Sequence, residues 1–372
     1  MKHLYSLLFA VLFISVQTAI AQTDTTAADT LSFDEEDYSI YDNLEFADES
    51  AKRFANVKVS GKSPDKLISI GYDWQGAYDM DLGRTSLLPQ TPTELPNEKA
   101  KVNSTHGMRV GANIPVISKN NIIIQAGFDY WEVNYDFEDK SKLTNPLAVS
   151  LAENGLTTLG FRTTVYKPLS ETSFLIGLAG ISMSGDYDVS ELQNGRYNRG
   201  VYALLWGKKP NDYKQWAVGL SRTYRAGELN YIPVVMYNWT GTNRKWGVET
   251  LFPARGDVRY NFSPRSMLFF GFDLEGNTYR IGNQGQALAD PLADLELRRS
   301  ELRFRFKYER QIKGFLWLSA KAGYRHNYSF NVDRVPGGKD FFRGFFGDQE
   351  YIMENELTNP LFVSFSINLV SP

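Results

Sequence analysis

The sequence predicts an all-β fold, a transmembrane, antiparallel, up-and-down β-barrel, and three observations lead to it. Apolar or aromatic residues alternate with polar ones over many segments, which is the pattern of strands with one apolar face. Short polar turns alternate with long connections along the chain. An export signal precedes all of these segments. Hairpins with tight turns at one end and long loops at the other are typical of outer-membrane barrels.

The first residues have the features of a secretory signal peptide. Lys2 precedes the apolar run 4–16, and the small residues Ala19 and Ala21 match the positions that a signal peptidase reads. We therefore expect residues 1–21 to be cleaved off during export. After them, no apolar run approaches the ~18 residues of a membrane helix, so the exported chain is either soluble or crosses a membrane with strands.

The composition argues against several other classes of protein. The chain of 372 residues has no cysteine, which excludes a disulfide scaffold and a thiol nucleophile. Its net charge of −3 argues against a nucleic-acid partner, which normally meets a basic face. The aromatic content of 14% fits the aromatic girdles of a membrane barrel. We expect no cofactor and no metal site.

After the signal peptide, the chain divides into two parts. Residues 22–63 are acidic, rich in Thr and Asp, and without lasting periodicity, so we expect a largely disordered periplasmic leader. From Leu67 onward the period is two, and we assign residues 64–372 to an outer-membrane β-barrel.

We count fourteen strands, because a single-chain bacterial barrel has an even number of strands and both termini on the periplasmic side. The count depends on residues 246–262, which could form one strand bent at Pro253 or two strands joined by a tight turn at 252–255. We prefer the turn, and twelve strands is the alternative. The predicted up-strands are 67–78, 121–136, 173–184, 214–225, 245–252, 266–281 and 314–328. The predicted down-strands are 103–115, 156–167, 198–207, 230–240, 254–262, 299–311 and 359–370.

A stretch of the second half resembles a known family. Val258-Arg259-Tyr260-Asn261 is followed, after a short turn, by the strand 271–279, GFDLEGNTY. These motifs resemble an exported outer-membrane β-barrel family of Bacteroidota, which is catalogued as a domain of unknown function. The resemblance implies an outer-membrane barrel, covers about 57–372, and carries over no activity and no functional residue.

Charged residues gather on the inward face of the strands in the second half. Because residues i and i+2 share one side of a strand, Arg303, Arg305 and Lys307 lie on one face. The turn 312–314 places Lys321 near Arg303 or Arg305. We further expect Arg325 near Glu301 and Arg255 near Asp273. The full predicted lumen cluster is Arg255, Arg259, Asp273, Glu275, Glu301, Arg303, Arg305, Lys307, Lys321 and Arg325.

Three interpretations of this cluster remain open. Salt bridges could fill the lumen and hold the barrel rigid. The charges could also form a selectivity zone in a water-filled pore, or bind an anionic ligand. In the long loop 336–351, Phe341, Phe342, Phe345 and Phe346 are expected to form a plug or cap, or an apolar patch for a partner.

The function that these features favour is a porin-like passive pore or binding channel for small solutes. The alternatives are a structural or surface-interaction barrel and a lipid-modifying enzyme. An enzyme is the weaker reading, because neither His106 nor His326 has an orienting partner in the sequence, and we name no catalytic residue. The expected location is the outer membrane of a Gram-negative bacterium. The expected partners are outer-membrane lipid, the assembly machinery and a small-molecule solute; no particular oligomeric state follows from the sequence.

Overall fold

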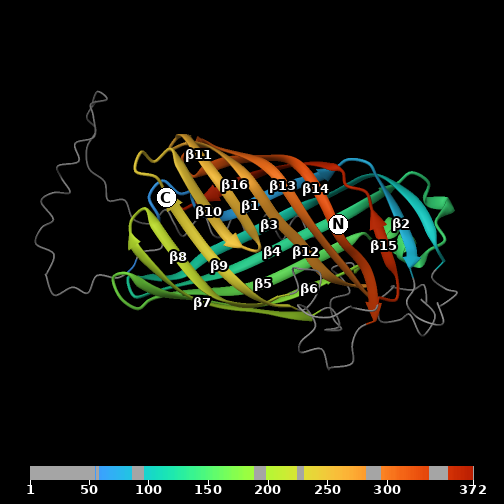
Figure 1. Cartoon of the computed structure of the whole chain (residues 1–372), viewed down its shortest axis with the longest axis horizontal. Coiled ribbons are helices and arrows are strands. Elements are labelled where there is room, and N and C mark those ends of the chain that lie inside the picture. The colour runs from blue at the N-terminus through green and yellow to red at the C-terminus, as the bar shows by residue number, and fades with distance from the viewer. Residues whose placement is uncertain are drawn as a thin grey trace, which may run out of the picture. The chain divides into compact units, whose positions relative to one another are not determined.

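Fourteen antiparallel strands form a closed barrel in the computed structural model of the chain (Figure 1). The structure describes Ala55 and residues 58–85, 96–187, 198–223, 230–281, 295–334 and 351–371. The sheet has sixteen strands, but two lie beyond one end of the ring: β2 pairs with the first residues of β3, and β15 pairs with β2. β1 closes the ring, because it pairs with both β16 and β3. The predicted fold class and strand number are confirmed.

The strands alternate in direction and follow one another around the ring. Their bounds in the first half are β1 Lys66–Gln75, β2 Tyr78–Thr85, β3 Glu98–Lys119, β4 Ile122–Phe137, β5 Leu156–Pro168, β6 Ser173–Gly185, β7 Asn198–Asn211, β8 Lys214–Thr223 and β9 Asn230–Thr240. In the second half they are β10 Trp246–Phe252, β11 Arg255–Ser263, β12 Ser266–Ile281, β13 Leu295–Lys313, β14 Leu316–Arg334, β15 Glu354–Leu357 and β16 Leu361–Val370. A 3-10 turn, η2 (Lys140–Lys142), and the short helix α2 (Pro146–Glu153) lie between β4 and β5.

The predicted turn at 252–255 decides the strand count. β10 and β11 pair with each other, Leu251 opposite Arg255, so 246–262 is a hairpin and not one bent strand. The predicted signal peptide lies outside the described residues, as does most of the predicted leader. Of the described helices, none is both long and apolar enough to cross a membrane.

The barrel is apolar outside, and the inward faces of β11–β14 are charged, the reverse of a soluble β domain. On β13, the outward Phe304 and Phe306 are 45% and 57% exposed, whereas the inward Arg303 and Arg305 are 4% and 3% exposed. The same alternation recurs on the other strands, and the exposed side chains include many aromatic rings. Such a surface is stable only where lipid replaces water around it. The architecture is therefore that of an outer-membrane barrel.

The wall of the barrel has unequal height. β13 and β14 have 19 residues each, whereas β10 has seven and β11 has nine. About ten tilted residues cross a bilayer, so the long strands project well beyond it at the end with the long connections. There β12 continues past β11 and meets β6 across the barrel, with Arg280 opposite Gly185.

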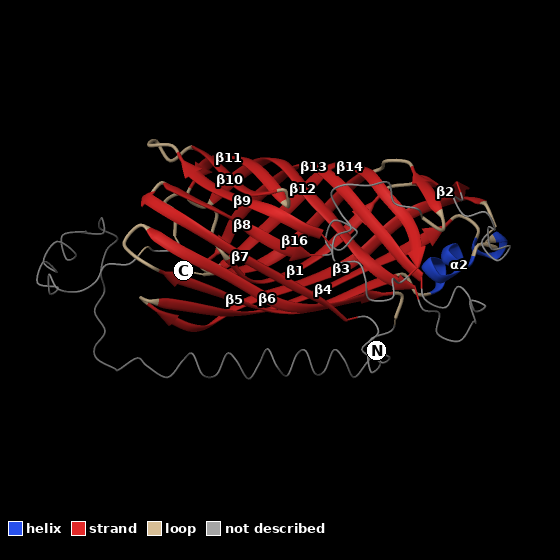
Figure 2. Ribbon diagram, turned by 60° about the horizontal axis from the view of Figure 1, so that its bottom comes forward, coloured by secondary structure: helices blue, strands red, loops and turns tan. Residues whose placement is uncertain are grey.

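An apolar cluster fills the projecting part of the barrel. It includes Leu82, Val102, Leu297 and Phe330, all completely buried, together with side chains of α2. Figure 2 shows α2 and β2 at this end, opposite the chain terminus marked C. The lumen is therefore closed at the long-loop end on the side formed by β2–β5 and β12–β15.

The residues just before β1 pack against the opposite, tight-turn end of the barrel. Ala55 N donates a hydrogen bond to Ser170 O in the β5–β6 turn, and Ser60 N donates one to Asp212 O in the β7–β8 turn. Ser63 donates through its backbone N and its hydroxyl to Glu249, at 2.9 and 2.6 Å. We call Ala55 with residues 58–65 the mouth segment, because its contacts run from one tight turn to the next and reach an inward side chain.

Candidate functional site

The lumen has two walls of different chemistry. The charged wall consists of inward residues on β1, β3 and β11–β14. Its members are Asp73, Arg109, Asp257, Asp273, Glu275, Arg299, Glu301, Arg303, Arg305, Lys321 and Arg325. These are six cations and five anions, so the wall is nearly neutral as a unit.

Arg303 is at the centre of one ion-pair network. Its guanidinium lies 2.9 Å from Glu275, 3.1 Å from Glu301 and 3.3 Å from Asp73. Arg109 binds two of the same carboxylates. Its Nη1 and Nη2 donate to Glu275 at 2.7 and 2.5 Å, and it also pairs with Asp73. β3 and β12 are not neighbours in the sheet, so the pair Arg109–Glu275 spans the lumen.

Arg305 is at the centre of a second network, one step nearer the tight turns. It binds Asp273 through Nε and Nη2, both at 2.5 Å, and Asp257 through Nη1 at 2.7 Å. Lys321 Nζ is 3.4 Å from Asp273 and its side chain is 30% exposed, so it is the part of this network that faces water. Bidentate pairs of this kind fix both partners in position.

Aromatic rings support the arginines at the long-loop end of the charged wall. Arg325 lies 4.4 Å above the ring of Tyr78 and donates to Gln75 at 2.5 Å and to Glu301 at 3.3 Å. Arg299 Nη2 is 2.5 Å from Glu301, at an angle that makes an ion pair but not a hydrogen bond. Its guanidinium faces the ring of Trp131 at 5.3 Å. Rings and carboxylates together replace the water that these cations lose.

Two smaller groups lie toward the tight turns. Lys307 Nζ is 3.7 Å from the Phe269 ring centre and shares Glu309 with Lys66, which binds that carboxylate at 2.8 Å. Arg259 is completely buried, donates to Thr240 at 2.8 Å and pairs with Glu249, which also holds the mouth segment.

Most of the predicted cluster lies together, with two corrections. The predicted contact of Arg325 with Glu301 exists, and Arg255 is opposite Asp273 as expected. However, the Arg255 side chain is exposed, while the contacts of Asp273 go to Arg305 and Lys321.

The second correction concerns the register of β13 and β14. The turn lies at Gly314 and Phe315, later than predicted, and a register irregularity follows between Gln311 and Lys313. Together they shift the pairs of residues 301–311 by two residues. Lys321 is therefore opposite Lys307 and not Arg303 or Arg305. It still approaches Arg305, because both bind Asp273.

Sequence reasoning missed Asp73, Arg109, Asp257 and Arg299 as members of the charged wall. All four alternate in phase with their inward neighbours, so the period-two pattern could have included them. Their partners could not have been found in this way, since Arg109 and Glu275 are 166 residues apart and lie on strands that are not adjacent.

The apolar wall lies on β6–β9, and some of its inward residues are partly accessible. Outward Leu204 is 61% exposed and outward Leu220 52%, so their neighbours Ala203 and Gly219 point inward. The inward Leu205 and Ala217 are buried in an apolar cluster with Ala55 and Phe174. The other inward residues at mid-height are small or apolar, uncharged and partly accessible. They are Ile176, Leu178, Gly180, Val201, Ala203, Gly219, Ser221, Val234 and Met236.

The other predicted features add no catalytic or metal site among the described residues. His106 stacks on Tyr72 on the outer face, and His326 is exposed on the outer side of β14. Within the described ranges neither histidine is hydrogen-bonded to a serine or a carboxylate, and no three metal-ligating side chains converge. The predicted plug residues Phe341, Phe342, Phe345 and Phe346 lie outside the described residues.

Comparisons with known proteins give only low similarity. No protein-family model and no curated protein matches the chain, so the resemblance to the Bacteroidota family stays a prediction. An outer-membrane channel from Pseudomonas putida F1 is 13% identical, with a TM-score of 0.32, and the match covers 82% of this chain and 97% of that one.

Two other solved structures are similar at the same level. The toluene transporter TodX of Pseudomonas putida is 8% identical, with a TM-score of 0.30 and coverage of 85% and 95%. The outer-membrane protease OmpT of Escherichia coli is 9% identical, with a TM-score of 0.27 and coverage of 83% and 100%. Such values do not bear on function, which has to be inferred from the residues of this chain.

Proposed function

We propose that this barrel is a passive channel for small, uncharged solutes, which move along the apolar wall. The observation that carries the proposal is the difference in accessibility between the walls. At mid-height the apolar wall has no charge and is partly accessible at Ala203 and Gly219, whereas Arg303 and Arg305 of the charged wall are almost completely buried in ion pairs. Toward the tight turns, the inward Leu205 and Ala217 of the apolar wall are buried in a cluster with Ala55. Accessible, uncharged side chains favour contact with uncharged solutes.

The unequal strand heights support the same route. At the long-loop end, the apolar cluster occupies the side formed by β2–β5 and β12–β15, and the contact between β6 and β12 lies between that side and β7–β11. β10 and β11 are the shortest members of the ring, and they adjoin the apolar wall at β9. A solute would therefore pass beside the short strands β10 and β11 at the long-loop end, and it would meet the mouth segment at the tight-turn end.

Solute-dependent swelling of liposomes tests this proposal. Liposomes containing the purified barrel should swell in isotonic solutions of small sugars and polyols at a rate that falls as solute size rises. Ala203→Trp places a large side chain in the proposed path and should slow swelling strongly. Leu204→Trp adds a similar ring on the lipid-facing side and should leave the rate unchanged. Equal rates for the two variants would exclude a path along this wall.

The second candidate is a structural barrel with a filled lumen. The ion pairs of the charged wall favour this candidate. Paired charges hold the strands together, whereas a selective pore needs charges that face passing solutes. Liposomes that contain the folded wild-type barrel and show no swelling with any small solute would support this alternative.

A further inference from the structure

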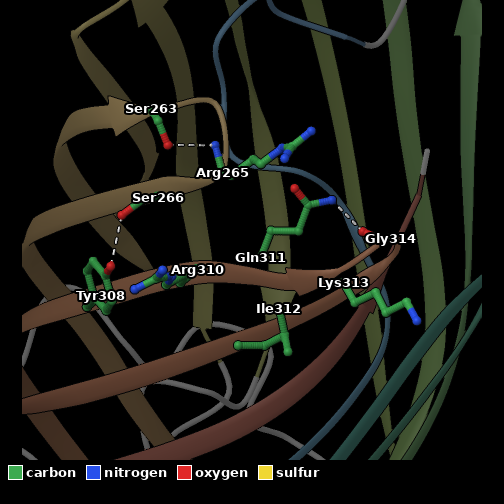
Figure 3. A pocket seen from close by; sticks show the side chains of 9 residues that line it. All are labelled: Ser263, Arg265, Ser266, Tyr308, Arg310, Gln311, Ile312, Lys313 and Gly314. Atoms are coloured by element: carbon green, nitrogen blue, oxygen red, sulfur yellow. Dashed lines mark hydrogen bonds between the residues drawn. The ribbon is translucent and has the colours of Figure 1, made fainter. Parts of the chain in front are cut away.

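A basic pocket lies on the outside of the barrel at the tight-turn end, away from both lumen walls. It is formed where the β11–β12 turn and the β13–β14 turn lie side by side, joined by a hydrogen bond of 2.9 Å from Gln311 N to Arg265 O. The pocket has a volume of about 760 Å³. Figure 3 shows its lining, in which Arg265, Arg310 and Lys313 supply three cations.

No carboxylate among the described residues neutralises these three cations. The lining contains no acidic residue, and among the residues that the structure describes none of the three forms an ion pair with Asp or Glu. The nearest carboxylate in sequence, Glu309, points inward and is used by Lys66 and Lys307. This contrasts with the charged wall, where the cations are paired.

The other groups of the pocket suit an oxyanion. Ser266 Oγ and Tyr308 Oη are 2.9 Å apart, and Ser263 Oγ accepts from Arg265 N at 3.2 Å. Gln311 donates to Gly314 O at 2.5 Å, which holds the turn beneath the cations. Hydroxyl groups next to guanidinium and ammonium groups are the donors that bind phosphate oxygens.

The position of the pocket indicates where such a phosphate would come from. Tyr308 and Arg310 continue the outward row of Phe304 and Phe306, so they face the membrane surface of β13. Ile312 in the pocket, and Phe315 next to it, are each 57% exposed. Apolar side chains below a group of cations match the boundary between acyl chains and headgroups. Tight turns lie on the periplasmic side of bacterial barrels, where the leaflet consists of phospholipid.

We propose that this pocket binds the phosphate headgroup of an anionic phospholipid in the periplasmic leaflet. Arg265, Arg310 and Lys313 would hold the phosphate, the hydroxyl groups would donate to its oxygens, and the apolar residues would contact the acyl chains. The bound lipid would anchor the rim of the barrel on the side of the charged wall.

Native mass spectrometry of the detergent-purified barrel can test the site. Phosphatidylglycerol should be retained in preference to phosphatidylcholine. The triple variant Arg265→Ala, Arg310→Ala, Lys313→Ala should bind phosphatidylglycerol about tenfold or more weakly. The matched control is Lys119→Ala, Lys167→Ala, Lys245→Ala, which removes three exposed lysines from other tight turns and should change binding by no more than about twofold.

Three results would overturn the proposal. The first is equal loss in the triple variant and its control, and the second is equal retention of the two lipids by the wild type. The third is binding of inorganic phosphate that phosphatidylglycerol does not displace, which would assign the pocket to a free anion. The heat-dependent shift of the folded band in gel electrophoresis shows whether each variant folds. If the triple variant does not fold, Arg310→Gln alone should still weaken phosphatidylglycerol binding.

Discussion

The two walls of the lumen are built on the same alternating pattern but differ in what they can do. The charged wall uses long side chains that reach one another and exclude water, as Arg303 and Arg305 do. The apolar wall uses short side chains such as Ala203, Gly219 and Ser221, which are partly accessible. An inward charge is therefore not in itself a sign of a pore, because a fully paired charge fills the lumen that it lines.

Removal of an arginine from the charged wall should have the largest effect on stability. Arg305→Ala leaves Asp257 and Asp273 buried with much less compensation and should lower the free energy of unfolding by about 3–5 kcal/mol. Urea unfolding of the detergent-solubilised barrel, followed by tryptophan fluorescence, measures this change. On the apolar wall, Val201→Ala removes only a half-exposed side chain and should cost far less.

A triple variant distinguishes two causes of instability, the loss of the Arg305 ion pairs and the burial of the carboxylates left unpaired. Arg305→Met combined with Asp257→Asn and Asp273→Asn removes both sides of the network. It should be more stable than Arg305→Ala, because neutral groups cost less to bury than unpaired charges. If the triple variant were less stable than the single one, the ion pairs would contribute net stability and the scaffold account of this wall would need revision.

The mouth segment should have an intermediate effect. Glu249→Gln replaces the carboxylate that binds Ser63 and Arg259 with a neutral amide. Hydrogen bonds to charged groups contribute about 1.5–3 kcal/mol each to folding stability. The free energy of unfolding should therefore fall by an amount in this range. Because the segment lies over the tight-turn end of the barrel, conductance in planar bilayers should rise. Ser63→Ala is the milder control, and it should shift both quantities in the same direction by less.

Lys321 should give the smallest change. It is the most exposed cation of the charged wall, and its 3.4 Å contact with Asp273 is the longest in the network around Arg305. Lys321→Ala should change the free energy of unfolding by about 1 kcal/mol or less, after allowance for solvent screening. If water reaches this wall at all, the reversal potential in a salt gradient should move toward cation preference. A large loss of stability would mean that the lysine is more tightly bound than its exposure suggests.

The sequence was sufficient for the fourteen strands of the ring and for the inward direction of most of the charges, because both depend on the period-two pattern. It also located the hairpin at Pro253, since an even strand count required it. It did not predict β2 and β15. The side-chain contacts within the lumen could not be predicted as fully from the sequence. The pairing of Lys321 depends on whether a turn includes Lys313, and a shift of one residue there moves each partner by two.

The remaining contacts depend on how the barrel closes. Arg109 meets Glu275 only because the cross-section brings two non-adjacent strands within reach. The mouth segment belongs to a stretch without any periodicity, so its contacts with Asp212 and Glu249 have no signal in the sequence.

The most direct test of the two-wall account uses the absence of cysteine from the natural chain. Single variants Ala203→Cys and Ser221→Cys place a thiol on the apolar wall, and Leu204→Cys places one on the adjacent lipid-facing side. Single-channel conductance is recorded in planar bilayers before and after a bulky, water-soluble thiol reagent is added. The account predicts that the reagent reduces conductance through both lumen-facing variants and leaves the Leu204→Cys variant unchanged. Conductance that continues unaltered after confirmed labelling at positions 203 and 221 would contradict it.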